Sequence, residues 1–236
     1  CIHHDGRVPR SVNDVIRKML NEAYKNGEVP QFGGPWFNSL ECGDLVAVNV
    51  TRAAADACDN RALRDAELRL REDMFTLFGK MKQTYPEFRG GHIVSSAMVA
   101  GVRETRHIRG CHTLCGEDFL GGRTYPDSIA LASHPVDIHS MKDASQKLTS
   151  LAEAAQIPYG CLVSDKCRNV ICAGRCISAD TVAFASIRVQ ATCMAMGQAA
   201  AVAAGVFMDA GEGAHVAHID TDELIARLHA VGGITE

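Results

Sequence analysis

The sequence lacks a pronounced excess of charge of either sign. Its 236 residues include 24 Lys and Arg against 28 Asp and Glu, for a formal net charge of -4 at pH 7. So small and slightly negative a net charge does not indicate a basic surface that would attract nucleic acid or an anionic membrane. We therefore expect neither as a partner. With 47% hydrophobic and 22% charged residues, intrinsic disorder is excluded, and one large or two small globular domains are expected.

No secretory signal peptide is visible either, although the first residue is Cys1 and not methionine. Either the chain has been processed, or its natural start lies outside this numbering. The ten cysteines are unevenly spaced, and several lie in apolar runs, where they behave as small hydrophobic residues. Because this usage is typical of a reduced protein, we expect a cytoplasmic location.

Hydrophobic periodicity predicts a mixture of helices and strands. The clearest signal is a helix over 61–85, which is rich in Leu, Glu and Arg and stops before Pro86. Further helices are expected over 11–26, 185–208 and 220–231, strands over 44–51, 92–100, 107–114, 159–164 and 169–173, and a loop over 141–150.

The Ala-rich helix expected over 185–208 is long and apolar, which raises the question of a membrane span. Its Ala and Gly residues supply little transfer free energy, and Thr192 and Gln198 interrupt the apolar run. We therefore predict a buried helix that neighbouring backbone approaches closely.

Residues 168–205, RNVICAGRCISADTVAFASIRVQATCMAMGQAAAVAAG, form the most informative stretch. The pattern predicts a strand that runs into Gly174-Arg175, then a loop, then a helix that opens near Ser186. The glycine allows close approach of a flat or anionic group to the backbone. The free amides of a helix N-terminus favour an electron-rich oxygen.

Four ordered blocks between about residues 49 and 205 carry a resemblance to a known family. They are NVTR at 49–52; GVRETRHI at 101–108 with GED at 116–118, YPD at 125–127 and PVDIH at 135–139; IPYGCL at 157–162; and AGRCIS, ASIRV and ATCMAMGQAA near the C-terminus. On these blocks the sequence resembles the C-terminal part of FAD-dependent oxidoreductases related to the fumarate reductase and succinate dehydrogenase flavoproteins.

The resemblance implies an α/β fold. We expect the C-terminal portion of a Rossmann-like FAD-binding domain plus a substrate-capping subdomain of mixed α+β structure. Residues 1–165 would form mainly the capping region, with strands that contribute to the flavin domain. Residues 166–236 would form the C-terminal part of the FAD-binding domain.

The resemblance also implies a cofactor, FAD, and the residues that contact it. Gly174, Arg175 and Ser178 would touch the flavin or its ribityl and pyrophosphate groups. Ala185, Ser186 and Ile187 would point backbone amides at the N1/C2-carbonyl edge of the isoalloxazine. Reduced flavin carries negative charge at N1, which a helix N-terminus stabilises.

Such flavoproteins begin with a strand, a G-x-G-x-x-G turn and a helix that bind the ADP half of FAD. The sequence contains no such segment, because Gly211-Glu212-Gly213 precedes no long helix. We therefore expect a complementary polypeptide to carry this segment, in a hetero-oligomer.

Three residues are candidates for hydride transfer between a small organic substrate and flavin N5. The guanidinium of Arg103 can donate two hydrogen bonds at once to a carboxylate, or donate to a carbonyl oxygen. His139 would donate or accept a proton near the flavin, or else be a buried, hydrogen-bonded histidine. Arg188 is expected just inside a helix N-terminus, where a cation opposes the dipole and needs a substrate anion, a flavin phosphate or a carboxylate beside it.

Two other functions remain open at this point. Cys1 could be the N-terminal nucleophile of a hydrolase, activated by its own amine. The chain could also be an interaction subunit that holds no cofactor. A metal site is not expected, because the spacings around Cys111, Cys115 and Cys161 match no standard ligand pattern.

Overall fold

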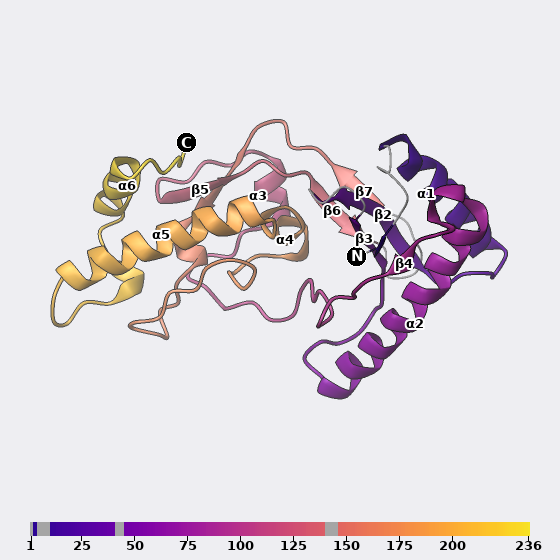
Figure 1. Ribbon diagram of the computed structural model, residues 1–236. Coiled ribbons are helices and arrows are strands. Elements are labelled where there is room, and N and C mark those ends of the chain that lie inside the picture. Colours follow the sequence, from indigo (N-terminus) through magenta and orange to yellow (C-terminus); the bar gives the residue numbers. More distant parts are fainter. Residues whose placement is uncertain (1, 4–9, 41–44, 140–145) are drawn as a thin grey trace. The chain divides into compact units, whose positions relative to one another are not determined.

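The computed structural model describes residues 2–3, 10–40, 45–139 and 146–236 (Figure 1). The chain divides into two compact units, one made of Cys1–Arg103 with Met141–Ala144 and the other of Glu104–Ser140 with Ser145–Glu236. Each unit has its own hydrophobic core. The predicted division at residue 165 concerns function, and it stays a prediction.

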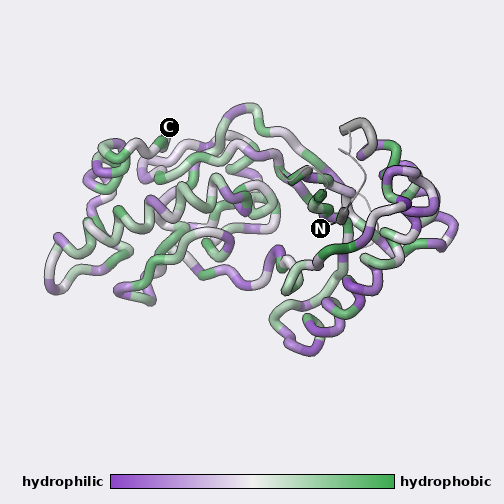
Figure 2. The backbone as a smooth tube through the Cα atoms, viewed as in Figure 1, coloured by the Kyte–Doolittle hydropathy of each residue, from purple (hydrophilic) through white to green (hydrophobic). Residues whose placement is uncertain are grey.

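The N-terminal unit packs two helices against a small sheet. Its elements are β1 (Ile2–His3), α1 (Arg10–Lys25), β2 (Phe32–Ser39), β3 (Leu45–Thr51), α2 (Asn60–Thr84), η1 (Pro86–Phe88) and β4 (His92–Ile93). The strand order is β2-β3-β1-β4, and every pair is antiparallel. Helices α1 and α2 contribute Leu20, Leu77 and Met81 to the core, while polar residues cover much of α2 (Figure 2).

The C-terminal unit holds most of the blocks that carry the family resemblance. Its elements are α3 (Gly116–Leu120), β5 (Ser128–Ala132), β6 (Val136–His139), β7 (Gln146–Thr149), β8 (Ala155–Pro158), η2 (Tyr159–Cys161), α4 (Thr181–Ile187), α5 (Gln190–Asp209), η3 (Val216–His218) and α6 (Thr221–Ala230). Strands β5 and β8 form one antiparallel pair, and β6 and β7 form another. Helix α5 packs on β5 and α6, and α4 packs on β6.

The helices were easier to predict than the strands. The expected helices over 61–85 and 220–231 are confirmed to within a residue or two, as is the strand over 44–51. By contrast, the ranges 107–114 and 169–173 contain only the isolated bridges Leu114↔Ala179 and Val163↔Ile171. Strand β7 lies in the described part of the expected loop. Residues 107–114 and 169–173 are held by individual hydrogen bonds to segments that are distant in the sequence. A local sequence pattern cannot distinguish this arrangement from a regular strand.

The prediction of a single helix over 185–208 is wrong, because two helices share this range. Helix α4 begins at Thr181, ends at Ile187 and has Arg188 as its C-cap. Val189 is extended, with φ -74° and ψ 155°, and α5 then begins at Gln190. The early start follows from Asp180, whose carboxylate accepts hydrogen bonds from the amides of Val182 and Ala183.

Helix α5 buries one stripe and leaves the other side open. Thr192, Met196, Ala199, Ala203 and Val206 are buried at helical spacing. The helix is long and apolar enough to span a membrane by length and composition, and its colour in Figure 2 is largely hydrophobic. Its buried stripe packs in the core of the unit, but most of the helix is not buried, so the expectation of a buried helix holds for this stripe alone.

The structure agrees with the expected α/β class in that it contains both helices and strands. In the described ranges, every pair of named strands is antiparallel. A Rossmann-like domain is built on a parallel sheet, so that detail of the expected fold is not seen here.

Asp180 should be worth more to stability than an ordinary helix cap. Its carboxylate also accepts a hydrogen bond from the amide of Gly116 at 2.6 Å, whereas the cap of α6, Asp220, accepts from Asp222 and Glu223 alone among the described residues. We expect Asp180→Ala to lower the free energy of unfolding by about 1 kcal/mol more than Asp220→Ala, measured by urea unfolding. Equal losses in the two variants would contradict the added role.

Candidate functional site

A cluster of polar side chains, three of them largely buried and one exposed, forms around Asp137. The Nε2 atom of His139 lies 2.9 Å from Asp137 Oδ2, and Arg188 Nη2 donates to the same oxygen at 2.8 Å. Gln146 donates to the other oxygen, Oδ1, at 2.6 Å. The side chains of His139, Asp137 and Arg188 are only 10%, 11% and 14% exposed. A carboxylate thus holds an imidazole and a guanidinium together away from bulk water.

Two strands and a helix end position this cluster. Asp137 and His139 are two apart on β6, so they share one face of the β6–β7 pair. Gln146 pairs directly opposite His139 across the two strands. Arg188 reaches Asp137 from the C-terminal end of α4, which packs on β6.

The helix context of Arg188 differs from the expectation. Arg188 lies at the C-cap of α4, where a cation is favourable, and immediately before the N-terminus of α5, where it is not. The cation next to the N-terminus of α5 needs a negative group beside it, and that group is the carboxylate of Asp137. A carboxylate is one of the three groups expected from the sequence, with a substrate anion and a flavin phosphate as the others.

The electrostatics of the cluster favour a charged Asp137. Burial by itself would raise the pKa of this carboxyl. Hydrogen bonds from His139 and Gln146, together with the charges of His139 and Arg188, outweigh burial and hold the pKa below its ordinary value. Asp137 is therefore an acceptor and not a proton donor near neutral pH.

One donor in the cluster is left over. Arg188 Nε is buried and has no hydrogen-bond partner among the described residues. A buried donor without a partner costs free energy, so this atom can gain from an acceptor oxygen brought by a ligand.

The turn at Gly174 lies close to the junction of α4 and α5. Gly174 has φ +85°, and a Cβ placed there would meet only Cys193 Sγ, at 3.9 Å, among the described atoms. The same sulfur donates to the Ile187 carbonyl at 3.7 Å. Cys193 thus connects the turn with the helix junction, and the Arg175 side chain beside it is exposed.

Ser178 is placed in the interior of the protein. It is 3% exposed, and its amide donates to the Cys161 carbonyl at 3.0 Å. Its carbonyl accepts from Leu114, and its hydroxyl pairs with that of Thr113. These bonds give Ser178 a structural role between segments, while its contact with a flavin stays a prediction.

The structure does not place the amides of Ala185, Ser186 and Ile187 at a helix opening. These three residues end α4 and are almost fully buried. The Ser186 hydroxyl donates to the carbonyl of His134. Because the Ala-rich helix begins at Gln190 without a side-chain cap, the free amides belong to the first turn of α5.

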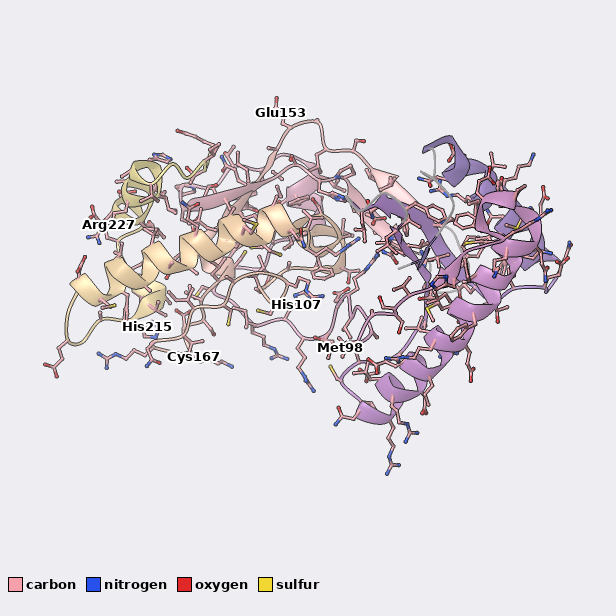
Figure 3. All side chains as sticks on the ribbon, viewed as in Figure 1. Met98, His107, Glu153, Cys167, His215 and Arg227 are labelled. Atoms are coloured by element: carbon pink, nitrogen blue, oxygen red, sulfur yellow. The ribbon has the colours of Figure 1, made fainter. Side chains whose placement is uncertain are left out.

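Other candidates lie outside this cluster. Arg103 is exposed and is the last residue of the main segment of the N-terminal unit, so the structure does not test its predicted role. Next to it in sequence, Glu104 pairs with His107, whose Nδ1 atom lies 2.8 Å from the Ile177 carbonyl (Figure 3). Cys1 lies outside the described residues.

Sequence reasoning missed Gln146 and the link between Asp137 and Arg188. The sequence pattern puts Gln146 in a loop, and nothing local marks it. The pairing of Asp137 with Arg188 joins residues 51 positions apart. Only the alternation that places Asp137 and His139 on one strand face was available as a signal.

A comparison with protein families adds an independent finding. The family model described as FAD dependent oxidoreductase matches residues 7–228. The chain belongs to this family. Membership implies FAD as the cofactor and a flavin-linked redox function. No curated protein and no solved structure shows significant similarity to the chain.

The residues present fit a flavin in part. The absence of a side chain at Gly174, the unpartnered Arg188 Nε and the uncapped start of α5 are features that an electron-rich, flat group would use. The amides of 185–187 do not fit, since they lie inside α4.

Asp137 should give the protein a pH-dependent share of its stability. A carboxyl whose pKa is lowered on folding stabilises the fold above its unfolded pKa of about 3.9, and loses this effect as the pH falls through the folded value. We expect Asp137→Asn to lower the free energy of unfolding by about 1–3 kcal/mol near pH 7, with a smaller loss near pH 3.

Urea unfolding at the two pH values measures this difference. Asp14→Asn is the control, because the Asp14 side chain is 86% exposed. A loss for Asp137→Asn that is the same at both pH values would show that Asp137 acts only through packing.

Proposed function

We propose that the chain is part of an FAD-dependent oxidoreductase that transfers a hydride between a small organic substrate and flavin N5. The observation that carries this proposal is the buried Asp137–His139–Arg188 cluster in a chain of this family. When bound, the flavin supplies the two-electron chemistry. The protein supplies binding, orientation and protons.

The cluster supports distinct roles for its members. Arg188, fixed by Asp137, offers the buried Nε–H to an acceptor oxygen of the substrate or cofactor. His139 holds or moves a proton, with Asp137 orienting its ring. Arg103 is assigned to substrate orientation, as its family block implies.

The cofactor would lie along the Gly174–Arg175 turn and reach the first turn of α5. Gly174 allows close approach of the flavin or its ribityl chain, and Arg175 is exposed beside it. The free amides at Gln190 and Ala191 would then take the role first expected of 185–187.

The segment that binds the ADP half of FAD is assigned to a complementary polypeptide. The open side of α5 supports this, because it exposes Met194, Gly197, Ala201 and Met208. Met194 and Met208 are 74% and 75% exposed. An apolar surface with small residues suits a second protein layer that completes a Rossmann-like domain.

A reducing compartment, such as the cytoplasm, is part of the proposal. All eight cysteines in the described ranges are free. Disulfides are rare in reducing compartments, where such thiols persist.

The central test is FAD binding by two matched glycine variants. Gly174→Ala and Gly211→Ala each place a side chain at positive φ, +85° and +77°, so both should lose about 1 kcal/mol of stability. Only Gly174→Ala should weaken FAD binding, by about tenfold or more. Quenching of flavin fluorescence on titration, with any co-purifying chain retained, measures the affinity.

Equal affinities in the two variants would overturn the assignment of the Gly174 turn. A chain that never takes up FAD, alone or with its co-purifying partner, would instead support the cofactor-free interaction subunit.

The partner surface on α5 can be tested by a charge. Ala201→Arg should abolish co-purification of the ADP-binding chain, because it places a cation in an apolar interface. Leu68→Arg, on an exposed position of α2, is the control. Retained association of Ala201→Arg in size-exclusion chromatography would place the partner elsewhere.

A further inference from the structure

The ring of His107 lies between two hydrogen-bond acceptors, and the proposed function does not use it. Its Nδ1 atom lies 2.8 Å from the Ile177 carbonyl oxygen, and its Nε2 atom lies 3.1 Å from Glu104 Oε1. A backbone carbonyl and an ionised carboxylate only accept hydrogen bonds, so both bonds form only when each ring nitrogen carries a hydrogen. Because imidazole is a stronger base than a carboxylate, the extra proton of this pair belongs to His107.

The surroundings of the ring leave Glu104 as its charged partner. Among the described residues, Glu104 is the charged side chain that pairs with His107, and the Phe184 ring of α4 packs against the imidazole with 5.1 Å between centroids. The side chains of His107 and Glu104 are 19% and 35% exposed, so the pair can exchange a proton with solvent. Other ionisable side chains of residues 104–110, the turn and α4 are exposed or bond elsewhere: Arg106, Arg109, Arg175, Cys176, Asp180 and Arg188.

His107 holds the residue that closes the Gly174–Arg175 turn. The Ile177 amide donates to the Gly174 carbonyl at 3.4 Å, and the Ile177 carbonyl lies against His107 Nδ1. Next to this contact, the amide of Ile108 donates to the Cys176 carbonyl at 2.9 Å. The segment that carries His107 therefore runs along the end of the turn, and the imidazole is the side chain that binds the carbonyl there.

We propose that Glu104 and His107 are a positioning pair for FAD. With both ring nitrogens protonated, the pair holds the turn in the form that receives the cofactor. When Nδ1 gives its proton to water, the hydrogen on Nε2 stays, because its bond to the carboxylate is charge-assisted. The Nδ1 lone pair then faces the Ile177 oxygen, and the turn is released because two acceptors repel each other. This inference rests on the proposed placement of FAD along the turn.

Nitrogen NMR of the histidine rings measures the protonation of the pair directly. Protein labelled with nitrogen-15 histidine, with any co-purifying chain retained, is titrated from about pH 5.5 to about pH 8.5, the range in which histidines change charge. The His107 signals are those that His107→Gln lacks. We expect hydrogens on both nitrogens at low pH and on Nε2 alone at high pH. In Glu104→Gln the amide group can donate to Nε2, so the remaining hydrogen should stay on Nδ1.

The same pH series measures the affinity for FAD by quenching of flavin fluorescence. Wild-type affinity should fall about tenfold from low to high pH, in step with the loss of the proton. Glu104→Gln should show no such fall, because its Nδ1 hydrogen still binds Ile177. Asp165→Asn is the matched control, since Asp165 Oδ1 lies 3.5 Å from Nε2 of another histidine, His218. This variant should show the wild-type fall.

Three results would overturn the positioning role and leave the proposed function standing. His107 could keep one protonation state over the whole series, wild-type FAD affinity could stay constant while the proton is lost, or Glu104→Gln could show the wild-type fall. Wild-type protein that binds no FAD at any pH would instead overturn the proposed function, and the role of the pair with it. The wild-type affinity series gives its answer even if a variant does not fold.

Discussion

The carboxylate of Asp180 is the interaction on which the C-terminal unit depends. It accepts the amides of Val182 and Ala183, which starts α4, and the amide of Gly116, which ties a distant segment to that start. Helix α4 is short and ends at Ile187. Its end places Arg188 against β6, and the next helix then opens at Gln190.

Asp137 resolves the electrostatic problem that this arrangement creates. Arg188 lies between the favourable C-terminal end of one helix and the unfavourable N-terminal end of the next. The buried carboxylate neutralises the guanidinium and at the same time binds His139. A structural ion pair would use the same contacts as the proposed redox site, and the Nε atom of Arg188 has no hydrogen-bond partner among the described residues.

The ordered sequence blocks correctly indicated an FAD-dependent oxidoreductase, while the finer relationship to the fumarate reductase flavoproteins stays a prediction, and they located the site only by segment. They pointed to Gly174, His139 and Arg188, which the structure places in one unit. They misplaced the free amides by a few residues, because they did not reveal that the Ala-rich helix is interrupted before Gln190. The interruption lies between Arg188, the C-cap of α4, and the extended Val189, and helical periodicity does not show it.

Local signals in the sequence by themselves determined α2 and α6, since capping residues, apolar spacing and Pro86 act within one or two turns. The tertiary structure alone decided which residues meet at Asp137. Arg188 and Gln146 reach it from other elements, and single long-range bonds take the place of the strands expected over 107–114 and 169–173. Contacts between distant residues depend on how whole elements pack, which no local pattern encodes.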